Sequence, residues 1–123
     1  MMIQSTWDIA TARNVCRKVI LGQKLSPTLC GRAVAVVAVL GELILLSQMR
    51  GSLDVREIPQ QGKRGIEIRC SLVLVSEPTP SLETTRSQLE RVVDALHVHV
   101  QDNLLEISAH IWPSDAILSP LFG

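Results

Sequence analysis

Two histidines one residue apart, His97 and His99, are the first side chains in this sequence that could do chemistry together. Side chains two residues apart on a strand point to the same face, so a strand here would place both imidazoles side by side. With Asp102 or His110 they could form a metal site. Because no third ligand follows at a spacing typical of zinc sites, we expect a solvated strand face and no metal.

Glu42 is the second candidate, since it is a lone carboxylate inside the most apolar segment of the chain. Ionisable residues in apolar surroundings are enriched at catalytic sites. Two simpler interpretations compete with a catalytic acid. Glu42 could pair with a basic residue such as Arg32 or Arg50, or it could lie at a helix rim near solvent.

The cysteines Cys16, Cys30 and Cys70 are odd in number, widely spaced and set among apolar residues. No pair has the CxxC spacing of a zinc ligand set. This usage predicts buried free thiols in a reducing compartment. The first residues lack the basic region and apolar block of a signal peptide, so we expect a cytoplasmic protein.

The overall composition narrows the classes of partner. Lys plus Arg equals Asp plus Glu at 12 each, so the net charge is zero, which argues against the clustered positive charge of a nucleic-acid surface. The chain has 123 residues, of which 46% are hydrophobic, enough for one domain with its own core. Zero charge with high apolar content favours association with another protein or with a second copy.

The element that must position any site is an apolar helix predicted over residues 27–48. Its segment 32–47 is apolar around the whole helix, which is typical of a helix buried in a domain or spanning a membrane. A membrane span needs about 20 mostly apolar residues, and Glu42 interrupts this run, so we expect a core helix. Gly31 and Gly41 each cost about 1 kcal/mol relative to alanine, so we expect both to be offset by close packing against a neighbour.

The remaining elements follow from helical or alternating spacing of the apolar residues. We expect a short edge strand at 2–7, a helix over 9–22 capped by Asp8, strands at 52–58 and 66–75 joined by a loop at 59–65, a helix over 82–96, and strands from 98 and over 105–111 around a turn at 101–104. This order predicts an α+β two-layer sandwich, with a mixed or antiparallel sheet and three helices on one face. The domain covers residues 1–112, and residues 113–123 form a tail.

The element order resembles the Bergerat ATP-binding fold of the GHKL superfamily. It is most similar to the serine/threonine switch kinases and anti-sigma factors of bacterial partner-switching systems. Residues 8–13 with Arg17 and Lys18 resemble the start of their first helix, residues 62–68 resemble their hairpin and following strand, and residues 89–96 with the paired strands up to 112 resemble their C-terminal end.

The resemblance implies an ATP site on the central helix whose key residues are replaced here. The family carries a Glu that activates the attacking hydroxyl or water, and an Asn four residues later that holds magnesium. A register without gaps places these positions on Val39 and Leu43, and a shifted register places the acid on Glu42 and the magnesium position on Leu46. An aliphatic side chain cannot bind magnesium, which takes oxygen ligands.

The other nucleotide motifs of the family are also changed. The Asp-x-Gly-x-Gly turn that reads adenine corresponds to residues 75–80, where Glu77 could mimic the acid but both glycines are missing. No glycine lies between Pro80 and Leu89, so the backbone cannot cradle phosphates there. The resemblance therefore implies the fold without the ATP cofactor and without catalysis.

These observations predict a non-catalytic, degenerate GHKL module, a pseudo-kinase that acts in bacterial signalling through protein–protein contacts. Its partner would be a regulatory protein or a second copy, and neither nucleic acid nor a membrane. The candidate contact residues are a basic helix face, the two replaced positions and the apolar tail: Arg13, Arg17, Val39, Leu43, Leu118, Leu121 and Phe122. Plain core packing and a solvated helix face are the simpler roles for the helical residues. The alternatives are an active ATP-dependent kinase with a diverged site, and a structural subunit of a larger assembly.

Overall fold

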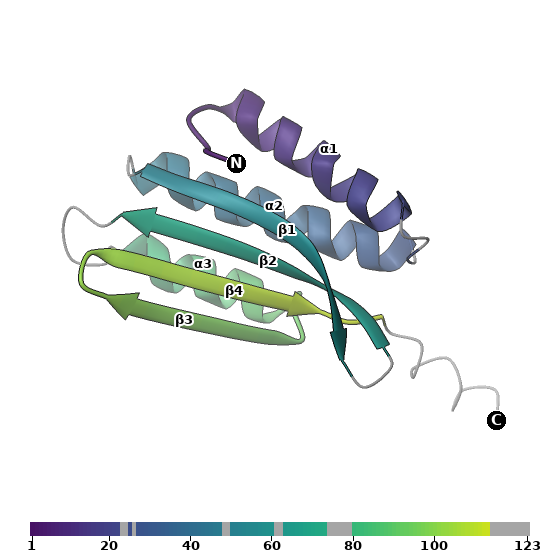
Figure 1. Ribbon diagram of the computed structural model, residues 1–123. Coiled ribbons are helices and arrows are strands. Elements are labelled where there is room, and N and C mark those ends of the chain that lie inside the picture. The colour runs from purple at the N-terminus through teal and green to yellow at the C-terminus, as the bar shows by residue number, and fades with distance from the viewer. Residues whose placement is uncertain (23–24, 26, 48–49, 61–62, 74–79, 114–123) are drawn as a thin grey trace.

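The computed structural model describes residues 1–22, 25, 27–47, 50–60, 63–73 and 80–113 (Figure 1). In chain order the elements are α1 (Thr6–Gly22), α2 (Pro27–Ser47), β1 (Arg50–Gln60), β2 (Lys63–Val73), α3 (Pro80–Glu90), β3 (Ala95–Gln101) and β4 (Leu104–Ile111). The three helices and the four-stranded sheet of these described residues confirm the predicted α+β class.

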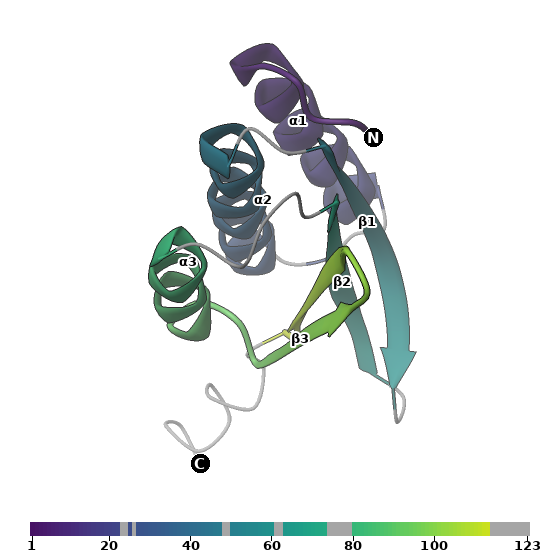
Figure 2. The same ribbon diagram turned by 90° about the vertical axis from the view of Figure 1, so that its left-hand side faces the viewer.

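The sheet has the order β1-β2-β4-β3, and every pair of neighbouring strands is antiparallel. Leu53 lies opposite Cys70, and Cys70 lies opposite Ile107, so these side chains share one face of the sheet. All three are buried. Figure 2 shows the helices together on that side of the strands, with α2 between α1 and α3. The alternation of buried and polar residues along β4 follows from this one-sided cover.

Helix α2 forms the centre of the core. Val36, Val37 and Leu40 are fully buried, and α2 contacts α1, α3 and the strands β1, β2 and β4. By length and composition alone, Pro27–Leu46 could cross a membrane, but half of its most apolar stretch is buried inside the fold. The helix packs as the core helix that the sequence predicted, because its apolar residues face neighbours on several sides.

Helix α1 begins earlier than predicted, and Asp8 is not its cap. Ser5 precedes the first helical residue, and its Oγ lies 3.4 Å from the Asp8 amide nitrogen. The Asp8 carboxylate lies in the first turn and accepts a hydrogen bond from the Gln4 amide at 2.8 Å. Within the expected edge strand at 2–7, Met2 alone forms a β-bridge, with Ser52. The Ser5 side chain therefore offers an acceptor to one amide of the helix end, and the Asp8 carboxylate ties the preceding chain to the first turn.

The third helix is shorter than the predicted span 82–96, because α3 ends at Glu90. The amides of Val92 and Val93 both donate to the Leu89 carbonyl, which closes a turn. The next residues enter the sheet, where Leu96 lies opposite Ala109. Helical spacing alone could not show that the sheet competes for this segment, although two successive β-branched valines favour leaving the helix.

The buried thiols follow the prediction. Cys16 and Cys70 are fully buried, and Cys30 is half-buried. Burial raises the pKa of the Cys70 thiol to about 12. Burial, together with the nearby Cys30, also raises the pKa of Cys16 to about 12, against an opposing effect of Arg17. Since the thiolate is the reactive form, both groups are inert at neutral pH.

Candidate functional site

A groove of about 310 Å³ lies between α2 and α3. Helix α2 contributes the aliphatic residues Val39, Leu43 and Leu46 and the carboxylate Glu42, and α3 contributes Thr84, Thr85 and Gln88. Leu43 is buried at its floor, Val39 is half-buried, and Leu46 is 73% exposed. The groove therefore has an apolar α2 wall with one acid and a polar α3 wall.

The α2 residues of the groove recur at spacings of three and four, so they form one face of the helix. Both registers proposed from the sequence fall on this face. Val39 and Leu43 belong to the gap-free register, and Glu42 and Leu46 belong to the shifted one. In either register, the position that the resemblance assigns to the magnesium ligand carries an aliphatic side chain.

A magnesium-bound nucleotide does not fit the described lining of the groove. Glu42 is the one ionisable side chain among its described residues, and none of those residues is basic. A carboxylate repels phosphate groups, and magnesium requires several oxygen ligands with octahedral geometry. Glu42 is exposed, as the rim interpretation expected. The carboxylate that pairs with Arg32 belongs to Asp94.

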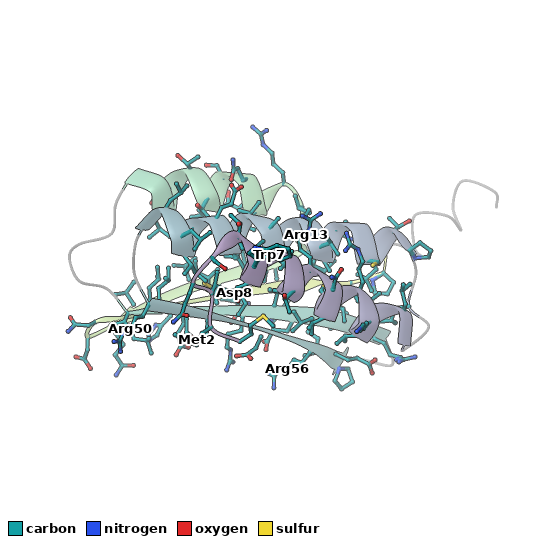
Figure 3. All side chains as sticks on the ribbon, turned by 90° about the horizontal axis from the view of Figure 1, so that it is seen from above. Met2, Trp7, Asp8, Arg13, Arg50 and Arg56 are labelled. Atoms are coloured by element: carbon teal, nitrogen blue, oxygen red, sulfur yellow. The ribbon has the colours of Figure 1, made fainter. Side chains whose placement is uncertain are left out.

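The basic residues predicted for partner binding do not line this groove. Arg13 and Arg17 lie on α1, on the other side of α2 from α3 (Figures 2 and 3). Arg17 donates a hydrogen bond to Asn14 at 2.9 Å. The Nε of Arg13 is buried without a hydrogen-bond partner among the described residues. Glu77, Leu118, Leu121 and Phe122 lie outside the described residues.

A polar cluster on the outer face of the sheet was missed from the sequence. Glu67 on β2 is 6% exposed, and its carboxylate accepts from Arg56 Nε at 2.7 Å and from His110 Nε2 at 2.9 Å. The His97 ring meets the His110 ring edge-on, with centroids 5.4 Å apart. Figure 3 shows Arg56 on the side of the sheet away from the helices. The strand register places these residues next to one another, and a single sequence does not show the register.

Burial pushes the pKa of Glu67 upward, but the hydrogen bonds from His110 and Arg56 outweigh it. The net effect is a pKa below the ordinary value of 4.5. Glu67 is therefore ionised at neutral pH. A carboxylate that is buried and doubly hydrogen-bonded in the folded state links protein stability to pH.

Glu67→Gln is expected to weaken the loss of stability in acid. Because the folded-state pKa is lowered, the ionised group stabilises the fold above about pH 4.5 and loses this effect as the pH falls through the folded-state pKa. We would measure urea unfolding midpoints of both proteins from pH 3 to pH 7. The midpoint of the wild type should exceed that of the variant most at neutral pH. Glu90→Gln, which breaks an exposed pair with Arg86, is the control and should change stability by less than about 0.5 kcal/mol. Parallel pH profiles for wild type and Glu67→Gln would contradict this assignment.

The two histidines of β3 lie on one face, as predicted, and this is the outer face. Both are exposed, and His99 Nε2 lies 3.4 Å from Gln101 Oε1. His110 is next to His97, whereas Asp102 lies in the turn after β3. Within the described part of one chain, no three His, Cys, Asp or Glu side chains are grouped closely enough to hold a metal ion.

The chain shows no significant match to any family model, to any curated protein or to any solved structure. The GHKL relationship therefore stays a prediction from the sequence motifs, and the α2–α3 groove contains the positions that this prediction concerns.

Proposed function

We propose that this chain is a non-catalytic protein-binding module, derived from a switch kinase or anti-sigma factor and acting in the bacterial cytoplasm. The observation that supports the proposal is the aliphatic wall of the α2–α3 groove. Val39, Leu43 and Leu46 occupy positions where ATP-dependent relatives need an acid or a magnesium ligand. Such a wall favours the side chains of another protein over a triphosphate.

The groove also indicates the chemistry of the bound segment. Leu46 is 73% exposed, and covering it gains about 25 cal/mol for each Å² of apolar surface removed from water. Glu42 lies on the same face and attracts a cation. The partner segment should therefore place an aliphatic side chain against Leu46 and Val39, and a Lys or Arg beside Glu42. The threonines and glutamine of α3 offer hydrogen bonds to its backbone.

A nucleotide titration tests the loss of ATP binding. Isothermal titration with ATP and magnesium should give no binding at micromolar concentrations. Leu46→Asn places an amide four residues after the native Glu42 and so restores the acid-and-amide spacing of the shifted register. The same titration of this variant tests whether that spacing alone restores ATP binding. Micromolar binding of ATP to the wild type would overturn the proposal.

A matched pair of surface variants tests the partner-binding role. Leu46→Lys places a charge on the groove, and Leu21→Lys places one on α1, where the leucine is also exposed, at 56%. For a partner identified by co-purification, we expect Leu46→Lys to abolish binding and Leu21→Lys to leave it unchanged, with or without ATP. Equal effects of the two variants would exclude the groove as the binding surface.

An active kinase is the second candidate, and the observation that favours it is the exposed carboxylate of Glu42 in the groove. A kinase would transfer labelled phosphate from ATP to the same partner, and Glu42→Gln would abolish the transfer. A protein-binding module would transfer none, and its partner would still bind. The two outcomes are mutually exclusive for one purified pair.

A further inference from the structure

Among the described residues, strand β3 is an edge of the sheet with β4 as its one neighbouring strand. It occupies one end of the strand order. The other edge, β1, is hydrogen-bonded to the N-terminal residues, because the Gly51 carbonyl accepts from the Ile3 amide and the Leu53 amide donates to the Met1 carbonyl. Natural edge strands are commonly blocked by lysine, proline or a bulge. β3 reads Ala-Leu-His-Val-His-Val-Gln and contains neither lysine nor proline. Val100 near its end is 46% exposed.

The hairpin turn fixes which backbone groups of β3 face outward. β3 and β4 are joined by the two-residue turn Asp102–Asn103, where Asp102 has φ of 56°, and Gln101 lies opposite Leu104. In a two-residue hairpin the residues beside the turn exchange both backbone hydrogen bonds, and the pattern then alternates along the strands. Counting back from Gln101, the odd-numbered residues bond to β4. The backbone groups of Leu96, Val98 and Val100 therefore point toward the free edge.

A second copy of the chain can complete this edge by antiparallel pairing about a two-fold axis at Val98. Val98 would lie opposite Val98 of the second copy, and Leu96 opposite Val100, so that all outward backbone groups are paired. The apolar side chains of β3 would then continue across the helix side of both sheets. Zero net charge on each chain leaves no overall repulsion against this pairing.

The same register brings the histidines together on the outer face. His97 lies opposite His99 of the second copy in a pair without mutual backbone hydrogen bonds, where side chains are closest, with Cβ atoms about 4.5–5.5 Å apart. The two-fold axis repeats the pair, so four imidazoles surround the axis. Glu106, opposite His99 on β4, adds a carboxylate that attracts a cation to this face.

From this juxtaposition we propose that two copies pair through β3 and bind one transition-metal ion of the zinc class between His97 and His99 of both chains. One chain supplies two of these ligands, and the second chain completes the usual set of four for a structural zinc site. His110 stacks edge-on against His97 and is held by Glu67, so it orients His97 from outside the ligand set. This inference does not depend on the α2–α3 groove.

Zinc titration of the purified chain tests the proposal, with mass in solution measured by light scattering during size-exclusion chromatography. Zinc chloride should raise the mass in solution from that of one chain to that of two chains, with half a zinc ion bound per chain. EDTA should reverse the change. His99→Ala removes two of the four ligands at once. It should weaken zinc binding by more than about 100-fold, whereas His110→Ala, which removes an outer-shell partner alone, should weaken it by about 10–100-fold.

The strand edge is tested separately from the metal ligands. Val98→Pro removes an outward-facing amide on an edge strand, where proline is tolerated, and should prevent the dimer. Val100→Lys, at an exposed position, should do the same if Val98→Pro does not fold, as judged by circular dichroism. One ion per chain, a mass that zinc leaves unchanged, or a zinc-dependent dimer that survives His99→Ala would each overturn the proposal.

Discussion

Arg32→Ala is expected to lower the free energy of unfolding by about 2–4 kcal/mol, because the arginine joins three elements at one point. From α2, Nε donates to the Val92 carbonyl at 2.9 Å, and one terminal nitrogen donates to the Trp112 carbonyl at 3.1 Å. The other terminal nitrogen lies 3.1 Å from the carboxylate of Asp94, which also accepts from the Trp112 amide. The Arg32 side chain is only 23% exposed, so water replaces these bonds poorly.

Two substitutions calibrate this result, with urea unfolding followed by circular dichroism as the measurement. Arg32→Lys keeps the charge but lacks the planar fork of donors. Its free energy of unfolding should therefore lie between those of the wild type and Arg32→Ala. Arg86→Ala breaks an exposed pair with Glu90 on α3 and should cost less than about 0.5 kcal/mol. The interpretation is wrong if Arg32→Ala is no more damaging than Arg86→Ala.

Gly41→Ala and Gly31→Ala are expected to change stability in opposite directions, although both glycines lie in α2. A Cβ on Gly41 would lie 2.7 Å from Cγ1 of Ile9, so the Ile9 side chain or the helix α1 that carries it would have to shift. Overpacking of this kind costs about 1–3 kcal/mol. A Cβ on Gly31 meets no atom of the described residues within 4 Å, so the better helix propensity of alanine should raise stability by about 0.5–1 kcal/mol.

Thermal unfolding of the two single variants and of the double variant measures both effects. The sites lie ten residues apart on one helix, and Gly41 but not Gly31 lies against Ile9. The two changes in stability should therefore add in the double variant. Ile9→Ala should cost less stability in the Gly41→Ala background than in the wild type, because in that background it also removes the clash. If Gly41→Ala is as stable as Gly31→Ala, close packing does not explain Gly41.

The elements that depend on local sequence patterns were predicted from the sequence. Alternation located both hairpins, and the short polar turn before Leu104 placed the last one correctly. Pro27 and the apolar run located α2. The expected role of Gly31 was wrong because composition cannot distinguish a glycine under a neighbour from one facing open space. Of the two α2 glycines, Gly41 has a packed neighbour, Ile9, and Gly31 has none among the described residues.

The candidate site was predictable only in part, for the same physical reason. The four-residue spacing of Val39 and Leu43 showed a shared helix face, but the sequence did not show that α3 lies across it. The cluster around Glu67 depends on a strand register that brings Arg56 and His110 to either side of one carboxylate. Contacts between distant segments decide both features, and no local pattern specifies them.

The two tryptophans give this tyrosine-free chain two optical reporters in different surroundings. Trp7 on α1 is 81% exposed, so its emission already resembles that of a tryptophan in water. Trp112 lies so close to Gly65 that a Cβ there would meet its ring. The red shift of fluorescence during denaturation therefore comes from Trp112, and a Trp7→Phe protein would report in real time on the junction that Arg32 holds together.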